Sequence, residues 1–480
     1  MRAVRAASVA LASLDPSRWS RVVDGLAGLG FDTLDLPLVW RDHDRGGGRF
    51  DFQSPRLNVA AFLKHVEARG LRAVVRLGPG PVEGLEALGL PERVVRDPNL
   101  ASRTRRNNPR VTPAGLRLVP LPSRASRGYR FESRQWVSAA LRALEPARGL
   151  VDAVLVGEGR AFSWRDEACD GDHHPDAVRP EPESPVGWLR ASATHEAEYL
   201  EALAQAVVEA GFGADQVVLS VSGPLSQSPV VPMLAPRFAF ATSAPGPRAG
   251  LRAIWREMRF AEALPRGALV TLHAGATVTE APVSSAHRRA VAELAFAAGV
   301  ERFSVHLGAA GDGAIGALVN AEGEPRPHAA RWQELVAQQR RWPRGTEWTL
   351  PLSHTQESLT ARLAALPPSG LPLGLFQSLG LGLDDFLGAA VLTESDSGVL
   401  PRVPLVAPAV EGYAVRAERE FPLLRVEPEV PVMSRCVATE AGVVWVLAHD
   451  HSEAVTVTTA LGERVAVAPG RPVAVAGGAL

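Results

Sequence analysis

Short apolar runs alternate with amphipathic stretches from the N-terminus to about residue 340, and this alternation restricts the fold more than any other feature. Repeated units of one strand and one helix form parallel sheets. Eight such units predict a (β/α)8 barrel, an α/β fold whose chemistry lies where the strands end. The apolar runs read as strands are 4–11, 33–38, 71–76, 150–157, 216–221, 237–242, 268–273 and 302–307.

Amphipathic segments near 134–147, 194–210, 250–263, 284–298 and 328–340 are the predicted outer helices of the later units. Two earlier helices have clear start signals. Asp15-Pro16 supplies a cap and a first helical residue, and Asn58 precedes a second apolar helical face. Polar segments at 84–130 and 159–193 interrupt the pattern after the third and fourth strands, where active-site loops belong in this fold.

The pattern changes after residue 342. Residues 343–428 are rich in Leu, Pro and Gly without a clear period, and we expect a mixed connecting region there. Between 429 and 480, valines alternate with polar or small residues, which is typical of strands with one buried face. The sequence therefore predicts a barrel over 1–342, a connecting region, and a small antiparallel β domain at the C-terminus.

Composition limits the class of ligand and the compartment. Lys and Arg number 51 against 52 Asp and Glu, so the formal net charge of −1 gives no field that attracts nucleic acid or an anionic membrane. Two cysteines, Cys169 and Cys436, exclude a disulfide scaffold and a zinc site built on several thiolates. The apolar stretch at the N-terminus is too short and too broken to span a membrane. We expect a cytoplasmic protein without a nucleic-acid or membrane partner.

Motifs in the first ninety or so residues carry a family resemblance. The run RVVDGLAGLGFDTLDLPLVWRDHDRGGGRFDF is followed by NVAAFLKHVEARGLRAVVRLGPGPVEG and then by GLP. In order and spacing it resembles the opening of the glycoside hydrolase family 35 β-galactosidases, which are related to family 42. Their opening reads roughly W-x-x-R-L-x-x-x-K-x-x-G, then N-x-x-x-x-Y-V-P-W-N-x-H-E, F-D-F, G-L-x-V-x-x-R-x-G-P-Y-I-C-A-E-W and G-L-P. The resemblance implies a retaining glycosidase acting on a β-galactoside-type glycan without a cofactor.

Weaker similarities assign the two catalytic positions. Residues 149–160, GLVDAVLVGEGR, are similar to the family segment that ends in the general acid/base, which implies that role for Glu158. Residues 265–275, PRGALVTLHAG, are similar to the segment whose E-L-W-x-G carries the nucleophile, and that position is Thr271 here. A retaining glycosidase needs two carboxylates about 5–5.5 Å apart. Because a threonine hydroxyl cannot replace the second one, weak or altered activity is expected.

Other positions of the family motif also differ. The asparagine before the acid/base is replaced by Gly157, the tyrosine of Y-V-P-W by Pro37, and the tyrosine after strand eight by His306. The glutamate of C-A-E-W falls on Gly84, with Glu83 one residue away. Most polar contacts to a sugar have therefore changed, whereas the motifs of the scaffold are retained.

Three interpretations remain open at this point. In the first, the protein is an active glycosidase in which Glu280, or Glu83, replaces the lost nucleophile. In the second, the covalent chemistry is lost, and the barrel is a catalytically inactive carbohydrate-binding or scaffold protein, with a protein partner or homo-oligomer as a further alternative. In the third, Glu158 works with the more distant Glu280 or Asp312 in an inverting reaction.

Residues that follow the predicted strands are the expected substrate contacts. Trp40, His43 and Asp44 have a packing or turn role as the alternative. His273 and His306 end neighbouring strands and could face the pocket together. The expected contacts are Trp40, His43, Asp44, Arg76, Glu83, Gly157, His273, His306 and Asp312. The segment 169–176 is rich in Asp and His but matches no zinc spacing, so no metal is expected. The arginines of 102–130 predict a solvated loop or a surface for an acidic glycan or partner.

Overall fold

The structure is a computed structural model. It describes residues 3–80, 85–114, 117–157, 171–181, 183, 185–221, 224–225, 228, 230–243, 251–273, 285–311, 316–343, 346–347, 350–351, 402–403, 425–427, 433–439, 442–458 and 463–478.

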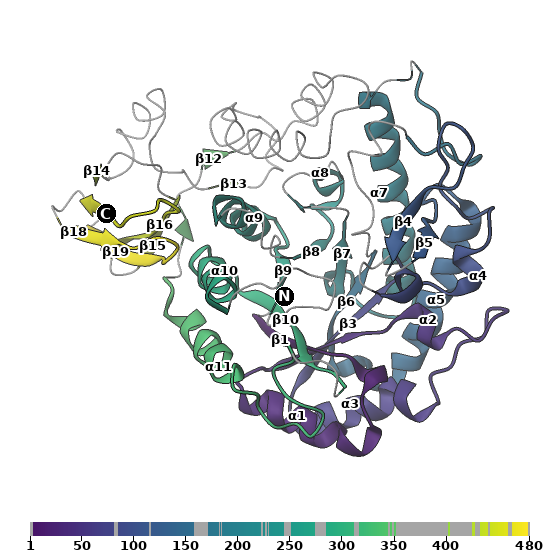
Figure 1. The fold of residues 1–480 in the computed structure, drawn as a ribbon, viewed down its shortest axis with the longest axis horizontal. Helices are drawn as coiled ribbons and strands as arrows, with labels where there is room; N and C mark the ends of the chain where they lie inside the picture. The colour runs from purple at the N-terminus through teal and green to yellow at the C-terminus, as the bar shows by residue number, and fades with distance from the viewer. Residues whose placement is uncertain are drawn as a thin grey trace.

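Eight parallel strands close into a barrel in the order β1-β10-β9-β8-β7-β6-β3-β2, which confirms the predicted (β/α)8 fold (Figure 1). The strands are β1 Val4–Val9, β2 Thr33–Pro37, β3 Arg72–Gly78, β6 Val151–Val156, β7 Val217–Ser220, β8 Ala239–Ser243, β9 Ala268–His273 and β10 Arg302–Ala309. Each overlaps one of the eight apolar runs of the sequence.

Helices surround the barrel on the outside (Figure 1). The longer ones are α1 Trp19–Gly28, α3 Val59–Ala68, α5 Arg127–Leu144, α7 Pro185–Glu209, α9 Leu251–Ala263, α10 Ser285–Ala297 and α11 Ala329–Gln338, and the short ones are α2 Trp40–His43, α4 Glu92–Val95 and α8 Val231–Leu234. Both predicted start signals are present. The Asp15 carboxylate accepts a hydrogen bond from the Ser17 amide at the short 3-10 turn before α1, and the Asn58 side chain accepts one from the Ala61 amide. In the described part of the chain, no helix is long and apolar enough to cross a membrane.

The interior of the barrel has an apolar layer toward the amino ends of the strands. Small and branched side chains fill it, as parallel barrels require. The layer consists of Val4, Ala6, Val74, Ala153, Leu155, Val218, Ala239, Ala241 and Leu269. Because side chains alternate along a strand, the next inward positions toward the carboxyl ends include Asp35, Arg76, Thr271 and Ser304. The barrel is therefore packed at one end and polar at the other.

The two polar interruptions pack against each other. The first contains a two-stranded hairpin, β4 Val111–Ala114 and β5 Arg117–Pro120, which the sequence analysis did not predict. Arg124, also in the first interruption, forms an ion pair with Glu196 of α7 at 2.6 Å, and the two side chains are 7% and 2% exposed. A buried ion pair thus joins the insertion after β3 to the helix after β6.

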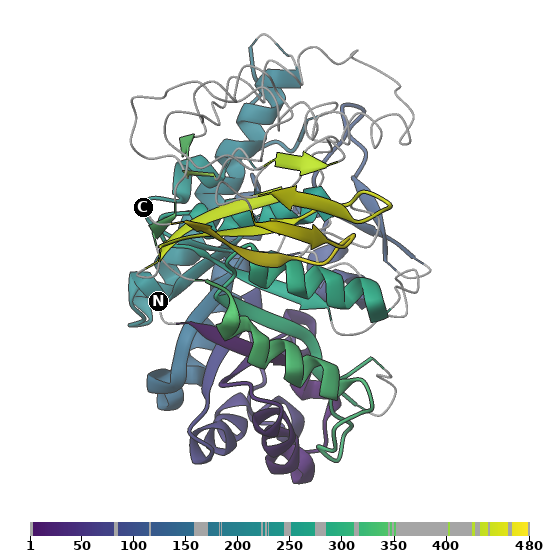
Figure 2. The ribbon, with the colours of Figure 1, turned by 90° about the vertical axis from the view of Figure 1, so that its left-hand side faces the viewer.

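Short antiparallel sheets occupy the C-terminal part, in agreement with the predicted β domain. One sheet contains β11 Thr346–Glu347, β15 Met433–Thr439, β16 Gly442–Ala448 and β19 Val473–Gly478. A second contains β14 Arg425–Glu427, β17 Val455–Thr458 and β18 Arg464–Val467, and a third pairs β12 Leu350–Pro351 with β13 Arg402–Val403. The C-terminal strands lie at one side of the barrel (Figure 2).

Strand β16 explains how the C-terminal sheets attach to the barrel. Val446 and Ala448 belong to the same buried cluster as the barrel and its helices. Trp445 and Leu447, on the opposite face, pack with valines of the second sheet. Because side chains alternate between the two faces of a strand, β16 contributes to both cores.

Candidate active site

A buried polar network lies at the carboxyl ends of four barrel strands. The Arg76 Nε of β3 lies 2.8 and 2.7 Å from the two carboxylate oxygens of Asp35 on β2 and donates to them. The Ser304 hydroxyl of β10 donates to the same carboxylate at 2.5 Å. Arg76 also donates from Nη2 to the Thr271 hydroxyl of β9 at 2.9 Å. One guanidinium thus joins side chains from opposite parts of the barrel wall.

Burial shields most of this network from solvent. Asp35 and Ser304 are fully buried, Thr271 is 4% exposed, and the Arg76 side chain is 12% exposed. A carboxylate held by a guanidinium and a hydroxyl, and without exposed surface, cannot approach the anomeric carbon of a sugar. Asp35 is therefore a structural partner of Arg76 and does not supply the missing nucleophile.

Thr271 occupies the strand position that the family resemblance assigns to the nucleophile. It lies between Ser243 of β8 and Ser304 of β10 in the parallel ladders. Its hydroxyl oxygen accepts a hydrogen bond from Arg76, which remains protonated in proteins and cannot remove the hydroxyl proton. The contact holds the threonine in place without activating it as a nucleophile.

His273 and His306 are neighbours beyond this network. They pair in the β9–β10 ladder, and their ring centroids are 5.4 Å apart at an interplanar angle of 64°. Both residues are partly exposed. Imidazoles can donate and accept hydrogen bonds, so this pair is suited to contact the hydroxyls of a carbohydrate.

Gly157 ends β6 in a conformation that a larger residue would not tolerate. Its φ is +88°, and its amide donates to the Gly78 carbonyl at 2.7 Å. A Cβ at this position would clash with the Leu200 side chain and lie 3.0 Å from the Ser220 carbonyl oxygen. The asparagine of the family motif therefore has no room at this position in the present packing.

This crowding predicts that Gly157→Ala lowers the free energy of unfolding by about 1–3 kcal/mol through overpacking against Leu200. Gly70→Ala is the matched control, because the φ of Gly70 is also positive, at +66°, and no atom lies within 4 Å of a Cβ built there. Denaturant unfolding of both variants measures the difference. Equal stability of the two variants would contradict the predicted clash.

Three of the expected substrate contacts are found in packing and turn contacts. Trp40 is 2% exposed, and its ring stacks on Trp136 with centroids 6.3 Å apart. His43 is also buried, its Nδ1 is 2.7 Å from the Asp51 carbonyl oxygen, and burial lowers its pKa below the usual value. Asp44 accepts from Arg93 at 2.7 Å in an ion pair.

Four expected site residues lie outside the described part of the chain: Glu83, Glu158, Glu280 and Asp312. Their roles remain predictions. The strand that leads to Glu158 is described up to Gly157, and the strand that precedes Glu280 is described up to His273. Both strands end at the face of the barrel that carries Arg76 and Thr271.

The Asp- and His-rich segment serves to hold the two insertions together. Asp172 accepts from the Arg103 amide at 3.1 Å and from the Ser123 hydroxyl at 2.6 Å. His174 Nε2 lies 2.8 Å from the Asn99 carbonyl oxygen. Among the described residues, no group of three or more His, Cys, Asp or Glu side chains is placed to hold a metal ion.

Sequence reasoning missed Asp35 and Ser304 as parts of this site. The signal for Asp35 was present, because an ionised carboxylate in the middle of the apolar run TLDLP must find a buried partner. Arg76, the last residue of the predicted strand 71–76, lies within β3. The opposite charges of Asp35 on one predicted strand and Arg76 on the next could have identified this ion pair from the sequence.

The closed eight-stranded barrel with polar side chains at the carboxyl ends of its strands is a TIM barrel. The model of the glycosyl hydrolases family 35 matches residues 2–110, which confirms the resemblance in the N-terminal motifs. No curated protein sequence matches this chain.

Solved structures with this fold include several glycosidases. A β-galactosidase from the Antarctic haloarchaeon Halorubrum lacusprofundi aligns with a TM-score of 0.52 at 14% identity, covering 73% of this chain and 60% of its own. The β-galactosidase of the psychrophilic Marinomonas ef1 aligns with a TM-score of 0.52 at 13% identity, covering 76% and 62%. The chain thus spans less than two thirds of the length of either enzyme, and the similarity shows a shared fold.

Proposed function

We propose that this protein binds a β-galactoside-type carbohydrate at the carboxyl ends of its barrel strands and has weak or no β-galactosidase activity. One observation carries the proposal. At the position assigned to the nucleophile, Thr271 is buried and accepts a hydrogen bond from Arg76, which is itself paired with Asp35. The scaffold of a family 35-like glycosidase is retained, while a neutral hydroxyl stands where a carboxylate is required.

The chemistry explains why this change is decisive. In a retaining reaction, a carboxylate attacks the anomeric carbon as the acid protonates the leaving oxygen. In the proposed site, Glu158 retains the acid/base role, but Thr271 has neither the charge nor a base to remove its proton. No carboxylate then stabilises the positive charge of the oxocarbenium-like transition state. The site therefore retains ligand binding and loses most or all of its turnover.

Turnover of an aryl β-galactoside tests this proposal. We expect little or no turnover by the unmodified protein, together with measurable binding of a β-galactoside by titration calorimetry. The active alternative, with Glu280 as nucleophile, requires covalent labelling by a fluorinated galactoside that is lost in Glu280→Ala. Robust turnover that disappears in Glu158→Gln would contradict the loss of activity, and absence of binding would contradict the carbohydrate site.

A carboxylate restored at the degenerate position gives a second test. Thr271→Glu introduces a carboxylate on a residue whose hydroxyl lies 2.9 Å from Arg76 Nη2. We expect this variant to hydrolyse the aryl galactoside faster than Thr271→Gln, which has the same size and no charge. Equal rates in the two variants would show that the position does not correspond to the nucleophile.

A further inference from the structure

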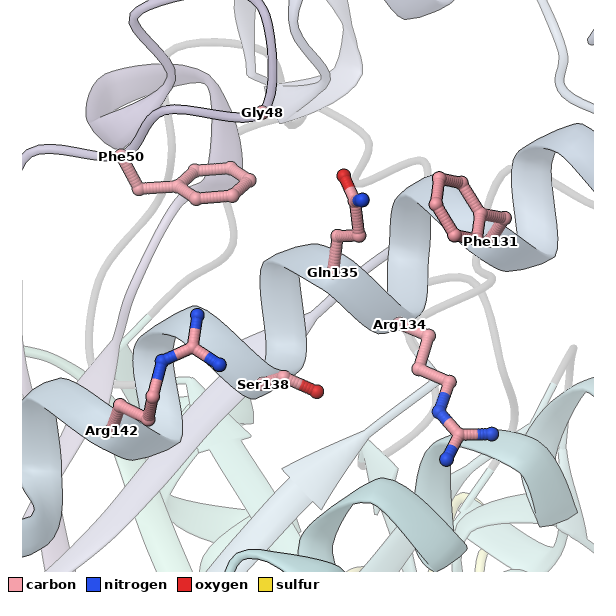
Figure 3. A pocket seen from close by; sticks show the side chains of 7 residues that line it. All are labelled: Gly48, Phe50, Phe131, Arg134, Gln135, Ser138 and Arg142. Atoms are coloured by element: carbon pink, nitrogen blue, oxygen red, sulfur yellow. The ribbon is translucent and has the colours of Figure 1, made fainter.

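A groove with a volume of about 340 Å³ lies on the outer side of α5 (Figure 3). One wall is the helix, and the other is the loop after α2 that contains Gly48 and Phe50. The lining residues are Gly48, Phe50, Phe131, Arg134, Gln135, Ser138 and Arg142. None of them belongs to the network at the ends of the strands.

Two aromatic rings flank this groove. Phe131 is 61% exposed, although its side chain is large and apolar. Phe50 lies on the other wall, where its ring is 5.6 Å from the buried Trp136 and is held at a defined position. In Figure 3 the amide of Gln135 stands between the two rings. An exposed aromatic face beside hydrogen-bonding groups is suited to a ligand with both apolar and polar surfaces.

The helix presents these groups as one stripe. Phe131, Gln135, Ser138 and Arg142 follow each other at intervals of four, three and four residues, which places them on one side of α5. From the first to the last the rise is about 16 Å, so the groove suits an extended ligand. A peptide usually binds through an apolar side chain that requires a closed pocket. The open shape of this groove is better suited to an extended ligand with repeated polar groups.

The charge of the groove is positive. Its charged lining residues are Arg134 and Arg142, and the lining contains no carboxylate. Arg134 forms an ion pair with Glu209 at 2.5 Å and points away from Phe50 (Figure 3). Arg142 is exposed and forms no ion pair within the described residues. A carboxylate on the ligand could therefore accept two hydrogen bonds from the Arg142 guanidinium.

We propose that this groove is a second saccharide site, separate from the barrel mouth, and that it binds an acidic oligosaccharide of the uronic acid type. The C–H faces of the sugar rings lie against Phe131 and Phe50. Gln135 and Ser138 bind hydroxyls, and Arg142 binds a carboxylate. This proposal does not depend on turnover or on binding at the ends of the strands.

Titration calorimetry of the 480-residue chain with an oligogalacturonide tests the proposal, with the neutral galacto-oligosaccharide of equal length for comparison. We expect the acidic ligand to bind, the neutral one to bind at least about tenfold more weakly, and added salt to weaken the acidic complex. Phe131→Ala and Arg142→Gln should each raise the Kd by about tenfold or more.

Leu118→Ala is the matched control, because Leu118 is an equally exposed apolar residue on the β4–β5 hairpin, at 67%. It should leave the affinity unchanged. A saturating aryl β-galactoside should also leave the oligogalacturonide affinity unchanged, since the two sites are separate. The proposal is overturned if the acidic ligand does not bind, if Phe131→Ala and Arg142→Gln bind it normally, or if the galactoside displaces it.

Discussion

Replacement of Asp35 by asparagine should lower the free energy of unfolding by about 3–5 kcal/mol, because it breaks a buried ion pair with Arg76. Asp35 is fully buried, and its two oxygens accept from Arg76 and Ser304. An asparagine has nearly the same shape, so the loss of charge is the main change. Denaturant unfolding of the full chain measures the effect.

A double replacement separates the cost of breaking this pair from the value of the pair itself. In Asp35→Leu with Arg76→Met, both charges are removed, and we expect much of the lost stability to return. Ser304→Ala removes one hydrogen bond to the carboxylate and should cost only about 1–3 kcal/mol. A loss below about 1 kcal/mol in Asp35→Asn would mean that water reaches the guanidinium and that the network is open.

The barrel was predictable from the sequence because its signals are local. The run 268–273 coincides with β9 at both ends, and the Asn58 side chain caps α3 as expected. Each signal depends on residues that are close together in the sequence. At this range the hydrophobic period and the capping side chain determine the local structure. The bounds of the other strands differ from the predicted runs by a few residues.

The hairpin within the first insertion had no comparable signal. Pro113 and Pro120 lie in its two strands, and proline usually argues against a strand. Val111 and Leu118 are exposed, at 48% and 67%, and each strand has a single buried residue, Ala114 or Val119, so the segment gives no run of alternating buried positions. Its polar appearance in the sequence reflects a surface hairpin that is held by ion pairs and hydrogen bonds from its flanks.

The candidate site was predictable only in part, because its contacts join distant residues. Asp35 and Arg76 are 41 residues apart, Arg76 and Thr271 are 195 apart, and Ser304 and Asp35 are 269 apart. The motif resemblance assigned Thr271 to the position of the nucleophile. It gave no indication that the threonine hydroxyl would accept from an arginine held by a buried carboxylate, since that contact follows from barrel closure.

Glu196→Gln should have an effect of similar size at the second buried ion pair. Arg124 and Glu196 are 7% and 2% exposed, with 2.6 Å between Nη1 and Oε2. The glutamine removes the charge and leaves the guanidinium buried, so we expect a loss of about 3–5 kcal/mol in the free energy of unfolding. Because the pair joins the insertion after β3 to α7, hydrogen exchange should rise more in the hairpin and in α7 than in β9.

An exposed pair between the two insertions provides the control. Arg105 and Glu183 also connect them, at 2.6 Å, but their side chains are 72% and 36% exposed. Glu183→Gln should therefore change the stability by less than about 1 kcal/mol, because solvent already screens that pair. Equal losses in the two variants would show that burial does not determine the strength of the connection. A large loss in Glu196→Gln alone, with faster exchange in the hairpin, would show that the buried charge pair stabilises the contact between the first insertion and α7.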